Sequence, residues 1–391
     1  MSADQEFNKS KARILFLLHI ARSALIGLVS SVRLSVSNER GFNLISGCSS
    51  HGGLGTAAQI VEDLATRNGI PVNRIYFDDQ NTPFITENLI YKNTIAVVAP
   101  GHLAFLRLVM PRIFGKKRKR AALLFWEVDL VPIHIIHAVK MLECVLSPSE
   151  FVGNILESSS QVRTTYFPMP LEIDRHPVEP LIRRRLQLQD QFLFCFQCDL
   201  SSGVARKNPI AVVEAYKMAF PEESTDTHLL LKTSNAVIDS ENWNQLQNEA
   251  LLRPDITLIN AIWSQLEVDS LYQEIDCYVS LHRSEGFGLT IAQAISSNKP
   301  VIATDYGGCK ELIELSGCFP VDYAVIPCSA TEIYPAGSHW ADPHREHASQ
   351  LMRKVYTEYR NGLSEQDKEN RRQAITIREK TASSVVQEFI S

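Results

Sequence analysis

The sequence of 391 residues lacks several features that would assign a function class at once. It contains no D-x-D triplet, so a magnesium ion held by such a pair of carboxylates is not expected. Basic residues are not in excess: 39 Lys and Arg against 44 Asp and Glu give a formal net charge of −5, and no nucleic-acid partner is predicted. Sequence repeats of the solenoid type are absent as well.

The sequence has only one pair of closely spaced cysteines. The eight cysteines are scattered, and only Cys195 and Cys198 lie close together, in a segment "FLFCFQCDL" that is typical of a buried strand. A metal or redox pair would need a second cluster or a strand-to-helix turn, and the sequence has neither there. We expect reduced structural cysteines in a cytosolic protein, with no metal and no cofactor.

A long uninterrupted apolar run is absent too. The most apolar stretch, residues 14–32, is broken by His19 and Arg22, and an arginine near the middle of a membrane-spanning helix is rare. Residues 1–40 therefore predict either a helix lying on a membrane surface or a packed N-terminal helix. The basic run "GKKRKR", residues 115–120, predicts either contact with an anionic membrane surface or a solvated loop. The expected location is cytoplasmic, with peripheral attachment to the inner face of the membrane as a variant.

From residue 42 onward the sequence alternates short apolar runs with amphipathic segments, which is typical of βαβ units. A proline-rich stretch from Pro168 to Pro180 separates two such series, and the chain length also favours two domains. Ligands of such folds bind at the carboxyl ends of the strands, so we expect the site in the cleft between the domains. The predicted organisation is an apolar and basic segment at 1–40, a first domain at 41–172, a linker at 173–190, a second domain at 191–368 and a C-terminal helix at 369–391.

The loop "RSEGFGL" in the second domain follows an apolar strand pattern and precedes a helix pattern. Unpaired N–H groups at a helix start favour an anion such as a phosphate, and Gly286 and Gly288 let the main chain approach a ligand closely. Glu285 can accept hydrogen bonds from hydroxyl groups without changing its protonation. The alternative is an acid that only interacts favourably with the helix dipole.

Cations follow two other strand patterns of the second domain. Arg206 and Lys207 stand just before a helix that is expected to begin at Pro209, where cations are unfavourable unless an anion binds beside them. Lys232, in "HLLLKT", ends the next strand at the same edge of the sheet. These cations predict a diphosphate site, with solvated surface charges as the alternative.

The first domain carries a glycine loop of its own. Gly53, Gly55 and Ala58 fit G-x-G-x-x-A between a strand and a helix, and Asp78 or Asp79 ends the next strand. This is the dinucleotide-binding fingerprint, so an NAD(P)-dependent oxidoreductase is an alternative function. That function would leave the anion site of the second domain without a role.

The stretch "SLHRSEGFGLTIAQAISSNKPVIATDYGG" resembles the signature of family-four retaining glycosyltransferases. "SHGGLGTAAQIVEDLATRNGIPV" is similar to the glycine loop of their N-terminal domain. Other segments are similar to a mannosyltransferase-like subgroup: "LLFWEVDLVP", "VLSPSEFV", "ARKNPIAVVEAY", "LLLKT" and "HWADPHREHASQLMRKV". The resemblance covers nearly the whole chain after residue 42. It implies an α/β fold of the GT-B type, with two facing Rossmann-like domains, mostly parallel sheets and an inter-domain cleft.

This resemblance implies a role for each part of the chain. The first domain would face the acceptor, the second would bind a nucleotide sugar, and the C-terminal helix would cross back to the first domain. Glu285 would bind hydroxyls of the donor sugar, while the amides of residues 286–288 face the diphosphate. Gln293 stands where the family has a second glutamate, which would contact the ribose, and an amide can still hold ribose hydroxyls with less strength.

Two departures from the family pattern concern charge and the acceptor side. Lys207 matches the lysine that neutralises the leaving diphosphate, but the accompanying arginine falls on Ser201, so Arg206 or Lys232 would supply the missing charge. Trp126 and Glu127 replace a histidine, and Glu127 would orient the acceptor hydroxyl. The implied catalytic residues are Glu285, Lys207 and Glu127. The implied donor-binding residues are Gly52, Gly53, Arg206, Lys232, Ile262, Ser284, Gly286, Phe287, Gly288, Leu289 and Gln293.

The activity implied is that of a retaining, metal-independent hexosyltransferase. It would move a hexose, in the first place mannose from GDP-mannose and otherwise a UDP-hexose, to a glycan or lipid-linked acceptor in surface polysaccharide biosynthesis. Besides the oxidoreductase, a second alternative is a non-catalytic nucleotide-sugar-binding partner of an active transferase, which Ser201 and Gln293 favour.

Overall fold

The computed structural model describes residues 37–47, 52–77, 89–115, 118–171, 179–237, 240–328 and 333–391. Most of the N-terminal segment predicted at 1–40 lies outside these ranges, as do Asp78, Asp79 and two residues of the basic run 115–120. Within the described ranges, no helix combines the length and the apolar character that a membrane crossing requires.

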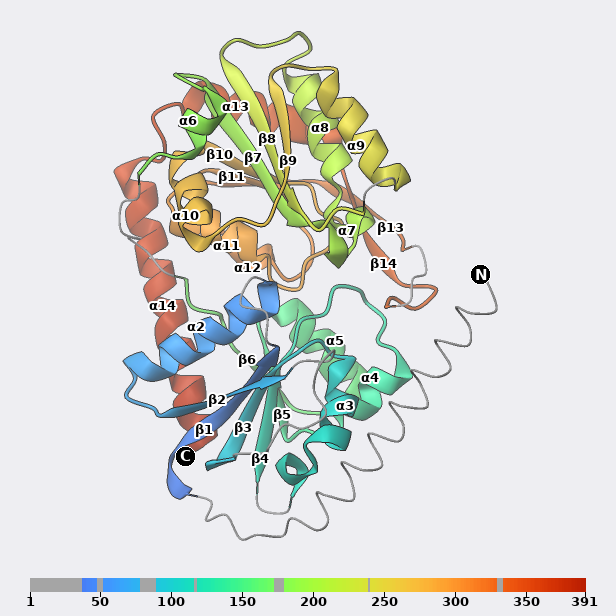
Figure 1. Cartoon of the computed structure of the whole chain (residues 1–391), viewed down its shortest axis with the longest axis vertical. Coiled ribbons are helices and arrows are strands. Elements are labelled where there is room, and N and C mark those ends of the chain that lie inside the picture. Colours follow the sequence, from blue (N-terminus) through green and yellow to red (C-terminus); the bar gives the residue numbers. More distant parts are fainter. Residues whose placement is uncertain are drawn as a thin grey trace. The chain divides into compact units, whose positions relative to one another are not determined.

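The chain divides into two compact units (Figure 1). The first contains the described residues up to Phe125, Val131–Met169 and Lys380–Ser391, and the second contains Trp126–Leu130 and Pro170–Glu379. The short segment Trp126–Leu130 therefore belongs to the second unit, although the residues on both sides of it belong to the first.

The first unit is built on a six-stranded sheet with the order β2-β1-β3-β4-β5-β6, in which all paired strands are parallel. Its core strands are continuous apolar runs, such as residues 95–97, because helices cover a parallel sheet on both faces. The strands are β1 (Ser37–Gly47), β2 (Val72–Phe77), β3 (Tyr91–Val97), β4 (Lys119–Leu123), β5 (Cys144–Ser147) and β6 (Thr164–Tyr166). The helices are α2 (Gly53–Arg67), α3 (His102–Val109), the 3-10 turn η1 (Pro111–Phe114), α4 (Ile133–Val139) and α5 (Glu150–Ser160).

The second unit repeats this plan with the strand order β12-β11-β10-β7-β8-β9, again parallel throughout. Its strands are β7 (Phe192–Asp199), β8 (Thr227–Ser234), β9 (Ile256–Asn260), β10 (Cys277–Ser280), β11 (Val301–Thr304) and β12 (Cys318–Val321). Its helices are α6 (Ile182–Leu186), the 3-10 turn η2 (Leu200–Ser202), α7 (Val204–Lys207), α8 (Pro209–Ala219), α9 (Glu241–Leu251), α10 (Gln265–Glu274), α11 (Leu289–Ser296), α12 (Lys310–Ile313) and α13 (Arg345–Glu358).

Alternation along the central strands of the second unit separates an apolar face from a polar one. Phe192, Phe194 and Phe196 of β7 pack into the main hydrophobic core with α8 and α13, and residues 229 and 231 of β8 lie on the same face. The residues between them point to the opposite face because side chains alternate along a strand. That second face carries Gln197 and Lys232, which are partners in the β7–β8 register.

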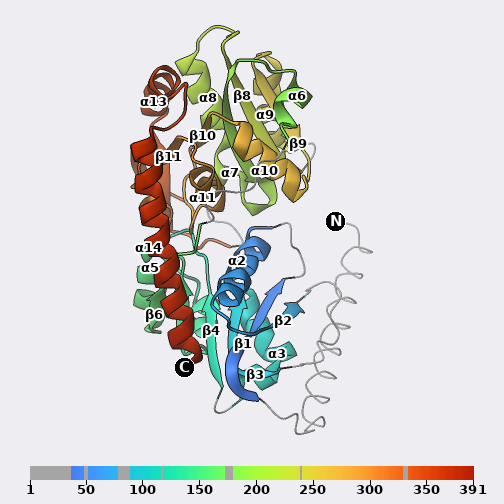
Figure 2. The same cartoon turned by 90° about the vertical axis from the view of Figure 1, so that its left-hand side faces the viewer.

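Two further elements complete the chain. A two-stranded antiparallel hairpin of β13 (Tyr323–Pro327) and β14 (His339–Pro343) belongs to the second unit. The long helix α14 (Glu365–Ile390) is continuous (Figure 2). Its last residues belong to the first unit, where the Asn93 side chain donates to the carbonyl of Ile390.

The prediction of parallel βαβ units is confirmed in both halves of the chain. Cys195 and Cys198 are free and buried in β7, as expected, and the other cysteines of the described residues are free too. The helix expected after the loop "RSEGFGL" is present and begins at Leu289. The antiparallel hairpin was not predicted.

Candidate active site

A buried ion cluster lies at the carboxyl end of β10 and β7. The Glu285 carboxylate accepts from Lys207 Nζ at 2.5 Å through Oε1, and Arg206 Nη1 lies 3.2 Å from its Oε2. Glu285 follows β10 in the chain, whereas both cations stand in the short helix α7 that follows β7. The structure brings these three residues together at one edge of the sheet.

The two cations of this cluster have different surroundings. The Arg206 side chain is 5% exposed, and its guanidinium also donates to the carbonyls of Ser284 and Ser202. The Lys207 side chain is 16% exposed and bonds to Glu285. Arg206 is thus held on several sides by the protein, while Lys207 has one anionic partner that an incoming anion could share.

The charge state of Glu285 follows from these neighbours. Burial by itself would raise the pKa of Glu285, but Lys207 and Arg206 together lower it to about 2. Burial would likewise lower the pKa of Arg206, and the adjacent Glu285 raises it instead. At neutral pH the cluster is therefore fully ionised, and Glu285 is an acceptor of hydrogen bonds rather than an acid.

The main chain of Glu285 is fixed by the loop that follows β11. Gly308 N donates to the Glu285 carbonyl at 2.6 Å, and Gly307 packs so closely that a Cβ atom on it would lie 2.8 Å from the same oxygen. Gly307 also has a φ of +89°, which glycine adopts without steric cost. A glycine is required at 307 for both reasons.

His282 contacts the same loop. Its Nε2 lies 3.2 Å from the Tyr306 carbonyl and 3.2 Å from the Cys309 sulfur, and its Nδ1 lies 3.0 Å from the Ser280 hydroxyl. Burial lowers the pKa of His282 to about 4, so the imidazole is neutral at pH 7. We assign His282 a structural role: it helps to fix the loop after β11, which in turn holds the main chain of Glu285.

Ser201, where the sequence resemblance predicts an arginine in related proteins, is an exposed residue of the turn η2. Its N–H and hydroxyl both bond to the Asp199 carboxylate, at 2.9 and 2.7 Å. Ser201 therefore brings no charge to the cluster.

Lys232 occupies a second polar neighbourhood on β8. It is 5% exposed, and its ammonium group lies 5.4 Å from the centre of the Trp263 ring. In the part of the chain that the structure describes, this ammonium group makes no ion pair and no hydrogen bond with a side chain. Burial lowers the pKa of Lys232. The Gln197 Oε1 atom, on the partner position of β7, is also buried with no hydrogen-bond partner among the described residues.

Glu127 joins the Glu285 cluster through the segment Trp126–Leu130. The Ser284 hydroxyl donates to the Glu127 carbonyl, and the Tyr334 hydroxyl donates to Glu127 Oε2 at 3.2 Å. The Glu127 carboxylate is close enough to raise the pKa of Arg206. Of the predicted catalytic residues, Glu285, Lys207 and Glu127 thus all lie in the second unit.

The remaining predicted residues have simpler positions. Gly288, with a φ of +85°, is the N-cap of α11, which begins at Leu289, and Gly286 and Phe287 precede it. Gln293 is half-buried on α11, and Ile262 is 68% exposed after β9. Gly52 and Gly53 belong to the first unit, where they start α2.

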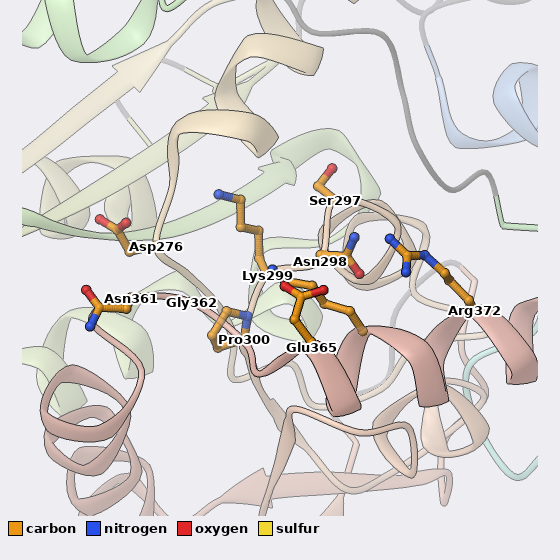
Figure 3. A pocket seen from close by; sticks show the side chains of 10 residues that line it. Asp276, Ser297, Asn298, Lys299, Pro300, Asn361, Gly362, Glu365 and Arg372 are labelled. Atoms are coloured by element: carbon orange, nitrogen blue, oxygen red, sulfur yellow. Dashed lines mark hydrogen bonds and ion pairs between the residues drawn. The ribbon is translucent and has the colours of Figure 1, made fainter.

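A surface pocket of about 480 Å³ lies at the other end of the second sheet (Figure 3). It is lined by residues that precede β10 and β11, such as Asp276 and Pro300, and by the first turns of α14. Two of its charged side chains already have partners in the protein: Asp276 pairs with Arg183, and Lys299 donates to the carbonyl of Gln273. The Glu285 cluster follows β10 instead, so this pocket is separate from it. In the described ranges, no group of three or more His, Cys, Asp or Glu could hold a metal ion.

Sequence reasoning did not identify Tyr334, His282 or Gly307 as parts of this site. Tyr334 lies in an irregular loop, and nothing in its surrounding sequence indicates a contact with Glu127. His282 stands at the end of a strand pattern, which does not indicate a role in the site. Gly307 and Gly308 stand together at the end of "ATDYGG", and two adjacent glycines are the one sequence feature that could have indicated a close main-chain contact.

The residues of the Glu285 cluster lie in a part of the chain that matches a known protein-family model. Residues 200–325 match the family model described as "Glycosyl transferases group 1". A trehalose synthase from Rubrobacter xylanophilus is 31% identical over 121 residues, which are 30% of this chain and 29% of that protein. The chain therefore matches less than a third of the length of this curated relative.

Solved structures resemble the chain over most of its length. Anabaena HepE in complex with UDP and glucose has a TM-score of 0.63 at 14% identity and covers 90% of this chain and 99% of that one. A glycosyltransferase from Rickettsia africae ESF-5 has a TM-score of 0.63 at 13% identity with the same coverage. A UDP-forming trehalose-phosphate synthase from Burkholderia xenovorans has a TM-score of 0.55 at 12% identity and covers 76% of this chain and 72% of that one. At such identities the likeness shows the fold, and the expected two-domain α/β fold of the GT-B type is confirmed.

Proposed function

We propose that this protein is a glycosyltransferase that moves a hexose from a nucleotide sugar to a hydroxyl group of an acceptor. The observation that carries the proposal is the cluster of Glu285, Lys207 and Arg206 at the carboxyl edge of a parallel sheet, inside the region that matches "Glycosyl transferases group 1". A carboxylate that stays ionised beside a lysine suits a ligand that has hydroxyl groups next to a diphosphate.

In this proposal each group acts on a different part of the donor. Glu285 accepts hydrogen bonds from hydroxyls of the sugar, and the amides of residues 286–288 at the start of α11 face the diphosphate. Lys207 shares its charge between Glu285 and the leaving phosphate. Arg206, which the protein holds on several sides, keeps Glu285 in place rather than contacting the donor.

The reaction we propose is substitution on one face of the sugar, with retention of configuration and without a metal ion. The bond between the anomeric carbon and the phosphate oxygen breaks, and its electron pair goes to the diphosphate. The acceptor oxygen forms the new bond on the same face, and its proton passes to the departing phosphate. The protein contributes positioning and stabilisation of the negative charge on the leaving group.

The identity of the donor and that of the acceptor are supported by different observations. Solved relatives of the same fold contain UDP with glucose, which favours a UDP-hexose, whereas the sequence resemblance favours GDP-mannose. Gln293 would contact the ribose, and Ile262 would contact the base through its main chain. Following the resemblance, the acceptor would be a glycan or a lipid-linked glycan of a surface polysaccharide.

A panel of nucleotides tests this function directly. We expect UDP and UDP-glucose to raise the melting temperature of the full chain, because ligands that bind the folded state stabilise it. Slow release of UDP from UDP-glucose should then be measurable. GDP and GDP-mannose acting instead would keep the function and change the donor, whereas stabilisation by NADH alone would contradict it. Binding of a nucleotide sugar without turnover, given plausible acceptors, would favour the non-catalytic partner.

Lys232 is expected to add the phosphate charge that Ser201 does not provide. The Lys232 side chain is largely buried and its ammonium group has no anionic partner among the described residues, so a bound phosphate would supply one. We expect Lys232→Met to weaken UDP binding about tenfold, measured by calorimetry. The free energy of unfolding should change little, because the ammonium group makes no ion pair among the described residues and methionine keeps most of the buried side chain.

Lys354 provides a matched control for this prediction. Its ammonium group also lies over an aromatic ring, Phe319, at 5.8 Å, but the residue is exposed on α13. Lys354→Met should leave UDP binding unchanged. Equal UDP affinity in Lys232→Met and the wild type would remove Lys232 from the donor site.

A further inference from the structure

The hairpin of β13 and β14 is bonded to the loop that carries Glu285. Ala341 N, in β14, donates to the carbonyl of Arg283 at 2.9 Å, and the Arg283 guanidinium pairs with Asp342 at 3.2 Å. Arg283 N in turn donates to the carbonyl of Arg206 at 2.8 Å. The hairpin is therefore connected to both strand-end loops of the ion cluster.

The same hairpin also holds the segment Trp126–Leu130. His339, the first residue of β14, bonds twice to the Asp129 carboxylate, through its N–H at 2.7 Å and its ring Nδ1 at 3.0 Å. Within the segment, Trp126 Nε1 donates to the carbonyl of Leu130 at 3.2 Å, which closes it into a compact turn. A stretch of chain far from the hairpin in sequence is thus fixed beside the Glu285 loop.

Tyr334, which precedes β14, makes the contact that bears on chemistry. Its ring packs edge-on against Trp126, with ring centres 5.9 Å apart, and its hydroxyl donates to Glu127 Oε2 at 3.2 Å. Tyr334 is 8% exposed, and burial together with Glu127 raises the pKa of its phenol, so the group stays a hydrogen-bond donor. One carboxylate oxygen of Glu127 is thereby oriented.

The position of Glu127 matters because its charge reaches the cluster of Glu285, Lys207 and Arg206. It is near enough to Arg206 to raise the pKa of that guanidinium, and Tyr334 is within electrostatic range of Glu285. A carboxylate held beside this cluster can accept the hydroxyl proton of an incoming acceptor in a hydrogen bond. Without Tyr334 the side chain of Glu127 would have more freedom to rotate away.

We propose that Tyr334 is a positioning residue, which holds the Glu127 carboxylate so that Glu127 orients the acceptor hydroxyl toward the donor sugar. The inference rests on the proposed glycosyl transfer. By this inference the loop that precedes β14 helps to place the acceptor. Tyr334 and Glu127 then act on the acceptor and not on the donor.

Tyr334→Phe tests the proposal because it removes only the hydroxyl and keeps the ring against Trp126. With UDP-glucose, and with GDP-mannose in parallel, we expect the rate of nucleoside diphosphate release to fall about tenfold while UDP or GDP affinity is unchanged. Tyr323→Phe is the control, since Tyr323 lies in the same hairpin and packs against Tyr306 instead. A wild-type release rate in Tyr334→Phe overturns the proposal.

Two further measurements separate positioning from a general loss of structure. If Tyr334 acts through Glu127, then Tyr334→Phe should add nothing to the defect of Glu127→Gln, whereas independent effects would multiply and contradict the proposal. Amide hydrogen exchange of residues 126–130 should be faster in Tyr334→Phe than in the wild type and in Tyr323→Phe. Unchanged exchange overturns the inference even if the wild type turns over no nucleotide sugar, a result that would count separately against the proposed function.

Discussion

Glu285→Gln should reduce turnover of the nucleotide sugar at least about a hundredfold, the usual cost of removing one preorganised group that stabilises a transition state. The amide keeps the volume of the side chain but removes the charge that Lys207 and Arg206 hold ionised. It also turns one acceptor oxygen into a donor, so hydrogen bonds to the sugar hydroxyls are lost. The measurement is nucleoside diphosphate release at saturating donor.

The control for this substitution is Glu314→Gln. Glu314 follows α12, is exposed, and makes no contact with the cluster in the described structure, so its substitution should change neither rate nor stability. Melting temperatures of both variants must be recorded, because a partly unfolded Glu285→Gln would mimic a catalytic defect. If a well-folded Glu285→Gln works at the wild-type rate, the assignment of the active site is wrong.

Arg206→Met should have the largest effect on stability. Methionine has a similar length but leaves Glu285 with one cation and leaves the carbonyls of Ser202 and Ser284 without their guanidinium donor. Breaking a buried ion pair from one side costs roughly 3–5 kcal/mol. We expect a loss of about 3 kcal/mol in the free energy of unfolding, measured by urea titration, and a melting temperature lower by roughly 6–12 °C.

Arg353→Met is the matched comparison. Arg353 also donates to two main-chain carbonyls, those of Met218 and Ala219, but it is an exposed residue of α13. Its substitution should cost less than about 1 kcal/mol, as is usual for exposed interactions. Similar losses in the two variants would show that burial of the Arg206 cluster does not determine its contribution.

The sequence predicts those parts of the molecule that depend on local patterns. Alternating apolar runs and amphipathic helices indicate parallel βαβ units. Residues in the connections that follow the strands, such as Glu285 and Lys207, meet at one edge because the strands are parallel. The strand order depends on long-range packing and is not encoded in any single segment. The hairpin was missed for a related reason: β13, "YAVIP", contains a proline and has no long apolar pattern.

The division of roles among the cations also required the structure. Arg206 and Lys207 are adjacent in sequence and carry the same charge, yet one is enclosed by carbonyl groups and the other has Glu285 as its partner. Spacing cannot distinguish them, because the difference lies in which loop each side chain reaches. The sequence likewise does not predict that Glu127 belongs to the second unit, since the chain before Trp126 and after Leu130 belongs to the first unit.

The hydrogen bond between Tyr334 and Glu127 has a consequence for the evolution of this chain. The two residues are 207 positions apart, and the value of each depends on the presence of the other. A relative that has lost the hairpin loop should be under no pressure to keep an acid at the position of Glu127, and a relative that carries the acid should keep a tyrosine or another donor in the loop. The pair should therefore be inherited or lost together.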